Sequence, residues 1–383
     1  MWALDPLNGH LWHVPALGHG AWENVTVVDT GVTTHVALVL ADDTAPFDAD
    51  LDSVPEAAPL FLYVGEKAPA GDFLARNGLR GGRLFVWVAD GGALTPLDFN
   101  GSGTLAGTWV EVDNTPLPAE ASEGGATGYD EWGFPTQRSL WTAAEAAGAF
   151  GFSRHEYVAT NPADGTEIVF ASTGVDTYAV DSGTGNGVDT FGTIYTMKLA
   201  FADLAQPTGA LTILYDGDAD AARALRSPDN LDWADDGAIY VQEDRAEVDT
   251  LSGDEVLFGA GATNPNEAGV VRIEAAVGSV TRIGNIDRAV VVDASIPDST
   301  AAVDRDAGIA GAWESSGILD VSLLFDQDPG TLFLLTVQAH GIRDQTSFNA
   351  ASRISDLDLV EGGQLLWLMA QEYASYVPAA GRN

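Results

Sequence analysis

Carboxylates in a repeated setting are the strongest chemical signal in this sequence. In four stretches, an acidic residue opens a short apolar run, a turn with Asp and Gly follows, and a second apolar run comes after the turn. The four acids are Glu23, Glu156, Asp229 and Glu314. If hairpins bring them together, they repel one another by several kcal/mol at an effective dielectric constant of about 20. Such a ring needs bound cations, and oxygen ligands in irregular geometry favour Ca²⁺ over Zn²⁺.

Further acids close the second apolar runs. Asp42 ends the run that follows Glu23, and Glu243 and Asp244 end the run that follows Asp229. These three residues are therefore added to the predicted metal ligands. An alternative stays open, because 56 acidic residues among 383 positions also place many solvated carboxylates in turns.

One base and one amide stand among these acids. Arg154 lies shortly before Glu156, and Asn230 directly follows Asp229. A guanidinium beside metal ions can bind two phosphate oxygens, and an amide can complete an oxygen shell or donate to a substrate. Arg154 and Asn230 are thus the predicted catalytic residues, although an ion pair and ordinary turn chemistry would also explain them.

The elements that must position these residues are β-strands. Short runs of β-branched and aromatic residues are bounded by Gly, Asp, Pro and Asn, and helical periodicity is scarce outside 142–149. This pattern predicts an all-β fold. Four hairpin units with an acid at the same place favour a β-propeller over a sandwich, because radial repetition brings strand ends to one channel. We predict a single domain over 1–383 with a long loop at 113–137.

Composition excludes several classes of function. The 17 Lys and Arg residues against 56 Asp and Glu give a net charge of −39, whereas nucleic acids and anionic membranes attract basic surfaces. The sequence has no Cys, so it offers no disulfide, thiol nucleophile or thiolate metal site. We expect no membrane span, because no apolar run is long enough, and the first residues lack the features of a signal peptide.

Several stretches resemble the PhoX-type alkaline phosphatases, a bacterial family. The most specific are SPDNLDWADDGAIYVQED at 227–244 and SRHEYVATNP at 153–162, which are similar to the family's Arg-Pro-Asp-Asn and Arg-Pro-Glu-Asp blocks. Further matching stretches are GHGAWENVTVVD at 18–29, VALVLADD at 36–43, RNGLRGGRLFVWVADGG at 76–92, WESSGILDVS at 313–322 and TLFLLTVQAHG at 331–341. The resemblance covers nearly the whole chain.

This resemblance implies a six-bladed β-propeller that hydrolyses phosphate monoesters with a cluster of calcium and iron ions. It implies contact of Arg154 with the phosphate, with Asn230 beside the metal-binding Asp229. It implies metal-binding roles for Glu23, Asp42, Glu156, Asp229, Glu243, Asp244, Glu314 and His340.

The chain also departs from the family pattern. The iron-binding Cys of the family has no counterpart, so we expect several Ca²⁺ ions, with Fe³⁺ in doubt. Four units are visible where the family has six, which indicates an incomplete propeller. Family members are secreted, so the resemblance implies a periplasmic or extracellular location. We expect a monomer.

The expected function is a calcium-dependent phosphate monoesterase that acts on small phosphate esters, with water attacking in line. Two alternatives stay open, a calcium-binding propeller without catalysis and a calcium-dependent enzyme of the lactonase type. Arg154 separates the classes in part, because a phosphatase needs a base among its acids and the other two do not.

Overall fold

The computed structural model describes residues 1–118, 126–244, 256–288, 302–304, 309–340, 342–344 and 361–369. Within these ranges strands dominate, and the α-helices are α1 (Phe73–Arg76) and α3 (Gln137–Ala146). Two short 3₁₀ helices are η1 (Pro15–Leu17) and η4 (Ser322–Phe325). The prediction of a mostly β fold is confirmed. In the described ranges, no helix has the length and apolar character needed to cross a membrane.

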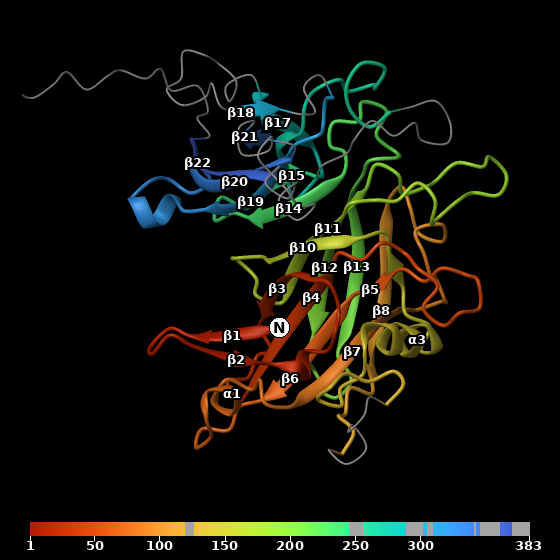
Figure 1. The fold of residues 1–383 in the computed structure, drawn as a ribbon, viewed down its shortest axis with the longest axis vertical. Coiled ribbons are helices and arrows are strands. Elements are labelled where there is room, and N and C mark those ends of the chain that lie inside the picture. Colours follow the sequence, from red (N-terminus) through yellow and green to blue (C-terminus); the bar gives the residue numbers. More distant parts are fainter. Residues whose placement is uncertain are drawn as a thin grey trace, which may run out of the picture.

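Nine strands form one antiparallel sheet that curves until it is nearly closed (Figure 1). Its order is β10-β11-β12-β13-β8-β7-β6-β4-β3, and the end strands β3 and β10 lie against each other. In chain order the strands are β3 (Trp22–Val28), β4 (His35–Asp42), β6 (Phe61–Glu66), β7 (Gly82–Ala89), β8 (Gly103–Val112), β10 (His155–Thr160), β11 (Glu167–Ser172), β12 (Thr193–Ala200) and β13 (Thr208–Asp216).

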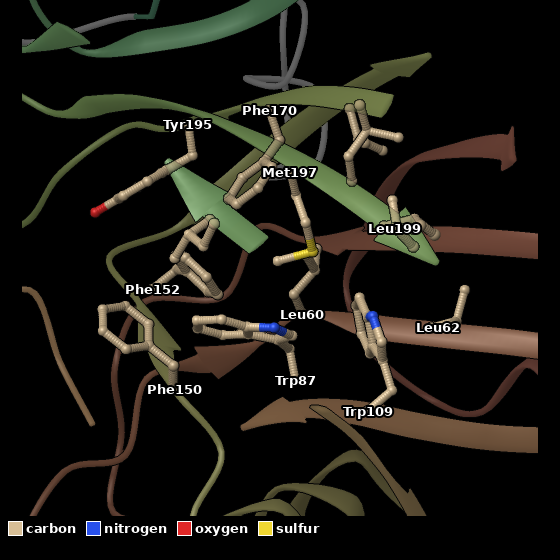
Figure 2. Close-up of a cluster of buried hydrophobic side chains, with 14 of the residues drawn as sticks. Leu60, Leu62, Trp87, Trp109, Phe150, Phe152, Phe170, Tyr195, Met197 and Leu199 are labelled. Atoms are coloured by element: carbon tan, nitrogen blue, oxygen red, sulfur yellow. The ribbon is translucent and has the colours of Figure 1, made fainter. Parts of the chain in front are cut away.

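Strands β4, β6 and β7 bury both faces, which explains their nearly continuous apolar sequences. Alternate residues of each strand enter different cores. One set points inside the curved sheet, where Trp87, Phe152 and Tyr195 belong to an aromatic cluster (Figure 2). The other set packs outside against α3, through Leu140 and Trp141. Each large side chain that is fully buried contributes about 1.5–3 kcal/mol, so this sheet is a stable platform.

Two further sheets continue the chain. One contains β14 (Pro228–Trp233), β15 (Ala238–Glu243), β16 (Gly269–Glu274) and β17 (Val280–Asn285), and the other contains β19 (Glu314–Asp320), β20 (Leu332–His340) and β22 (Glu361–Met369). Three two-stranded sheets pair β1 (Trp2–Asp5) with β2 (His10–His13), β5 (Ala58–Pro59) with β9 (Gly151–Phe152), and β18 (Ala302–Asp304) with β21 (Ile342–Asp344). Apolar cores fill the spaces between neighbouring large sheets.

Four strands occupy equivalent places in this arrangement. β3, β10, β14 and β19 each open one of the four units predicted from the sequence. Each of these strands lies against the next in chain order, β3 on β10, β10 on β14 and β14 on β19. The chain therefore brings the starts of the four units together, which is what positions the site.

Separate blades around a closed ring are not observed among the described strands. The first two units are joined into one sheet, because β8 pairs with β13 along their outer edges. Gly107 lies opposite Gly209 at this junction, and a Cβ on Gly107 would meet the Trp87 indole at 2.7 Å. Because neither glycine carries a side chain, β8 and β13 can pair directly beside the Trp87 indole. The single-domain interpretation stays a prediction, and residues 119–125 of the expected loop lie outside the described ranges.

Candidate metal centre

Six carboxylates converge where the four equivalent strands begin. They form two groups of three, and within each group one ligand oxygen per residue lies within 4.8 Å of the others. The groups are Glu23 with Asp43 and Glu156, and Asp229 with Asp244 and Glu314. Of the predicted ligands, the structure brings together Glu23, Glu156, Asp229, Asp244 and Glu314.

Irregular strand pairing aims three of these acids at the centre. The register shifts between Trp22 and Asn24 in β3, between His155 and Val158 in β10, and between Pro228 and Leu231 in β14. Each interval contains one acid of the centre. Such bulges rotate the inserted residue out of the regular alternation and are common beside active sites.

One backbone hydrogen bond recurs at the open end of three hairpins. We call this end, where the first strand begins and the second strand ends, the mouth of the unit. The amide of Asp43 donates to the Ala21 carbonyl at 3.0 Å, and the amide of Asp244 donates to the Ser227 carbonyl at 2.8 Å. In the second unit the amide of Thr173 donates to the Arg154 carbonyl at 2.8 Å. Asp43, Thr173 and Asp244 are therefore equivalent positions, and two of the three are acids that face the centre.

Arg154 places a guanidinium between the two carboxylate groups. Its Nε is 2.8 Å from Asp43 Oδ1, and its Nη2 contacts Glu156 and lies 3.3 Å from Asp244 Oδ2. The side chain keeps 27% of its surface exposed, whereas Glu156 keeps 2%. The base predicted from the sequence thus lies within the acids, with one side accessible to solvent.

Burial and repulsion from neighbouring carboxylates raise the pKa values of three of the acids. Burial, followed by the neighbouring Asp43 and Glu314 carboxylates, raises the pKa of Glu23 to about 7. Burial raises the pKa values of Glu156 and Asp229 well above their usual range, and each of the two is close enough to perturb the other. One guanidinium does not neutralise so many acids, so the centre has the electrostatics of a cation site.

Asp42 does not belong to this centre, although it was among the predicted ligands. Its carboxylate accepts hydrogen bonds from the Ala21 amide at 3.1 Å and from the Trp141 indole at 3.3 Å, and it is fully buried. Gln137 Nε2 also lies 3.2 Å from it. Because consecutive residues of a strand point to opposite sides, it is the next residue, Asp43, that faces the centre. The consecutive acids were the only sequence signal for Asp43.

Glu243 is also turned away from the centre. It is fully buried between two arginines, with Arg282 Nη2 at 2.8 Å and Arg226 Nε at 3.3 Å. Its carboxylate further accepts a hydrogen bond from the Gly269 amide at 3.1 Å. Asp244 alone of this predicted pair enters the carboxylate cluster, by the same alternation that separates Asp42 from Asp43.

Asn230 holds its neighbours in place. Its Nδ2 donates to Asp229 Oδ1 at 2.7 Å, and its Oδ1 accepts from Ser316 Oγ at 2.9 Å and from the Gly317 amide. These bonds fix the orientation of Asp229 and connect β14 to β19. This buried amide is engaged with the protein on both ends, so its geometry suits positioning rather than contact with a substrate.

One histidine contacts a carboxylate of the centre, and another links β10 to the end of β4. His340 Nε2 is 3.2 Å from Glu314 Oε2, at the end of β20. His155 is fully buried, its Nε2 accepts from the Asp42 amide at 3.3 Å, and burial lowers its pKa to about 3. A neutral His155 therefore connects β10 to the end of β4, while His340 adds a nitrogen donor beside Glu314.

A third group of acids lies apart from the centre, in the loop after β4. Asp48, Asp50 and Glu56 each offer an oxygen within 4.8 Å of the others. The Asp48 carboxylate accepts from the amides of Asp52 and Ser53 at 3.0 Å each, so these acids shape their own loop.

The chemistry of the donors in the centre fits hard cations. Among the described residues, the two groups offer carboxylate oxygens with one adjacent imidazole, and Ca²⁺ prefers oxygen ligands in flexible numbers. Burial and the neighbouring carboxylates raise the pKa values of Glu156 and Asp229, so these acids need additional positive charge nearby to ionise. Iron would find no thiolate here, because the sequence has no Cys.

Comparison with solved structures gives a match in fold. Pseudomonas fluorescens PhoX in complex with vanadate, a transition state analogue, aligns with a TM-score of 0.54 and 16% sequence identity. The alignment covers 96% of this chain and 57% of that one, so this chain spans little more than half of the matched protein. A puromycin hydrolase S511A mutant complexed with PGG aligns with a TM-score of only 0.25 and 14% identity, over 87% and 46% of the two chains.

The sequence comparisons point to the same family. No curated protein matches the chain. The family model of alkaline phosphatase PhoX matches residues 72–283, which is more than half of the sequence and includes Arg154, Glu156, Asp229 and Asp244. The prediction drawn from the sequence blocks is thereby confirmed, and the chain belongs to the PhoX alkaline phosphatase family.

Proposed function

We propose that this chain is a metal-dependent phosphate monoesterase of the PhoX type. The observation that carries the proposal is the convergence of six carboxylates and one guanidinium at the start of four equivalent strands. So many acids repel a phosphate ester unless bound cations reverse the sign of the local field. A metal centre therefore reconciles an acidic protein with an anionic substrate.

The proposed ion is Ca²⁺, bound at two or more positions. Glu23, Asp43 and Glu156 would hold one ion, and Asp229, Asp244 and Glu314 would hold another. A hard cation at such a site supplies positive charge to the phosphoryl oxygens and makes water a better nucleophile. The role of the six acids is to hold the ions, so they need not act as general bases.

The remaining side chains orient this centre and the substrate. Arg154 reaches it from the solvent-exposed side, so its guanidinium can donate to a phosphoryl oxygen and stabilise negative charge in the transition state. Asn230 holds Asp229 in one orientation, and His340 lies against Glu314. The contacts of Asn230 and His340 limit the freedom of Asp229 and Glu314 before any ion binds.

We further infer that the four units are blades of a propeller whose ring stays open over the described residues. The order of β3, β10, β14 and β19 and the recurring backbone hydrogen bond support this interpretation. The fold match to PhoX supports it as well. From the family resemblance we also propose a periplasmic or extracellular location.

A calcium-binding module without catalysis is the second candidate. The observation in its favour is that the two carboxylate groups offer enough oxygens to bind cations without any further catalytic group. The position of Arg154 among the acids favours the phosphatase, because cation binding alone gains nothing from an internal base. The same residue disfavours the lactonase alternative.

Hydrolysis of p-nitrophenyl phosphate tests the proposal. We expect activity with Ca²⁺, its loss on chelation and its return when Ca²⁺ is restored. Glu156→Gln should lower the rate at least about 100-fold by removing a ligand of the centre, whereas Asp90→Asn, an exposed acid in the β7–β8 turn, should leave it unchanged. An inactive chain that Ca²⁺ stabilises against heat would support the binding module, and a chain that neither binds Ca²⁺ nor hydrolyses the ester would overturn both.

A further inference from the structure

Arg154 contacts both carboxylate groups of the candidate metal centre at the same time. Asp43 and Glu156 belong to one group and Asp244 to the other, and the guanidinium reaches all three. A planar guanidinium with five N–H donors can bridge carboxylates in this way, which a single ammonium cannot do as well. One protein cation therefore holds together two sites that are built for metal cations.

The backbone commits Arg154 to this position. Its φ is 62°, in the left-handed region that residues other than Gly seldom adopt. Its carbonyl accepts the recurring hydrogen bond from the Thr173 amide, and this bond restricts movement of the Arg154 backbone away from the carboxylates. Strain of this kind persists where surrounding structure fixes it, and it clusters at functional sites.

The guanidinium and a metal ion compete for the same oxygens. Arg stays protonated at every accessible pH, so Arg154 cannot leave the acids by losing a proton. It can only rotate its side chain away, and the partly exposed side of the cluster leaves room for that movement. A cation that takes the Asp43, Glu156 or Asp244 oxygens must displace the guanidinium or share these oxygens with it.

We propose that Arg154 is an internal competitor of the metal ions and that metal binding releases it to bind the phosphate. This inference rests on the proposed function. It makes metal affinity and phosphate affinity interdependent, because both ligands require the same side chain to leave the same oxygens. Coupling of this kind is reciprocal for the two ligands.

The first test measures Ca²⁺ binding alone, by titration calorimetry on the intact chain without phosphate. Arg154→Asn removes the cation while keeping a residue that tolerates the left-handed region. We expect it to bind Ca²⁺ about 10-fold or more tightly, because a unit charge in contact with the ligands is gone. Arg154→Lys should lie between this variant and the wild type. Arg83→Asn, which removes an Arg from an exposed pair with Glu111, is the matched control and should not change Ca²⁺ affinity.

The second test measures binding of inorganic phosphate at saturating Ca²⁺. Arg154→Asn should bind phosphate about 10-fold more weakly than the wild type, since a charge-assisted donor is lost. Tighter Ca²⁺ and weaker phosphate in the same variant would support the proposal. Ca²⁺ affinity that is unchanged or reduced in Arg154→Asn would overturn it, because the guanidinium would then organise the ligands rather than compete.

Failure of the proposed function gives a different pattern. If the six acids hold no Ca²⁺, Glu156→Gln and the wild type will give the same calcium isotherm. If they hold Ca²⁺ and Arg154 does not compete, Glu156→Gln will weaken binding while Arg154→Asn will not strengthen it. Thermal unfolding in chelator shows whether each variant is folded. If Arg154→Asn fails to fold, Arg154→Lys takes its place in the comparison.

Discussion

Asp42 and Asp43 are consecutive carboxylates with different surroundings. Asp42 is buried and accepts hydrogen bonds from the Ala21 amide, Gln137 and Trp141. Asp43 is partly exposed and pairs with Arg154 at 2.8 Å. Pleating of the strand separates them, so one supports the fold and the other faces the metal centre.

Substitution of each residue separates these two roles. Asp43→Asn should weaken Ca²⁺ binding about 10-fold or more, because one charged ligand of the centre is lost, and should scarcely change the midpoint of unfolding in chelator. Asp42→Asn should lower the free energy of unfolding by about 1–3 kcal/mol, because its new NH₂ group faces donors. Calorimetry with Ca²⁺ and urea unfolding in chelator measure the two effects. Equal loss of Ca²⁺ affinity in both variants would contradict the assignment.

At the scale of elements, the geometry at the open end of each hairpin determines which acids enter the metal centre. The sequence predicted the four units correctly, because the apolar runs and turns that define a hairpin are local features. It did not separate Asp42 from Asp43, or Glu243 from Asp244, because the side that a residue faces at a strand end depends on the bulge across the hairpin. The pairing of β8 with β13 was not predicted for a different reason, because it joins segments far apart in the chain and local sequence patterns do not report such contacts.

Glu243, which points away from the metal centre, holds neighbouring segments of the chain together. It links the end of β15 to Arg226, which precedes β14, and to Arg282 in β17. Arg226 is itself fully buried, donates to the Leu257 carbonyl at 2.9 Å and lies 3.9 Å from the Phe258 ring centroid. This network holds the mouth of the third unit, from which Asp229 and Asp244 extend.

Removal of one charge from this network should lower the free energy of unfolding. Glu243→Gln leaves Arg226 and Arg282 without their counter-charge, and a broken buried pair costs about 3–5 kcal/mol. We expect a loss of that size in the free energy of unfolding, measured in urea at neutral pH. Glu111→Gln breaks the exposed pair with Arg83 and should cost less than about 1 kcal/mol. A loss below 1 kcal/mol in Glu243→Gln as well would show that the buried network does not stabilise this mouth.

For the whole molecule, the net charge of −39 is partly carried into the interior. Burial, with help from Asp218, raises the pKa of Asp189 to about 7. Burial raises the pKa values of Asp218 and Asp232 to about 6. These carboxyl groups lie outside the two carboxylate groups of the metal centre, so bound ions do not neutralise them.

Stability in chelator should therefore fall as the pH rises. A carboxyl group with a pKa of about 4 in the unfolded chain and about 7 in the folded chain binds more protons when folded between these values. Its contribution is fully present below about pH 4 and is lost as the pH passes through about 7. Asp189 is 1% exposed, so little solvent screening reduces its share.

Asp189→Asn isolates that share. The amide oxygen of the new Asn can still accept the hydrogen bond that Thr193 gives to Asp189 Oδ1 at 2.8 Å, and its side chain carries no charge at any pH. Urea midpoints from pH 4.5 to 8 should coincide with those of the wild type at the acidic end and exceed them at the alkaline end. Asp90→Asn, which removes an exposed acid, should leave the pH profile unchanged. A wild-type slope in Asp189→Asn would mean that Asp189 ionises without cost and that the interior tolerates its charge, in which case the pH dependence has to come from the carboxylate cluster itself.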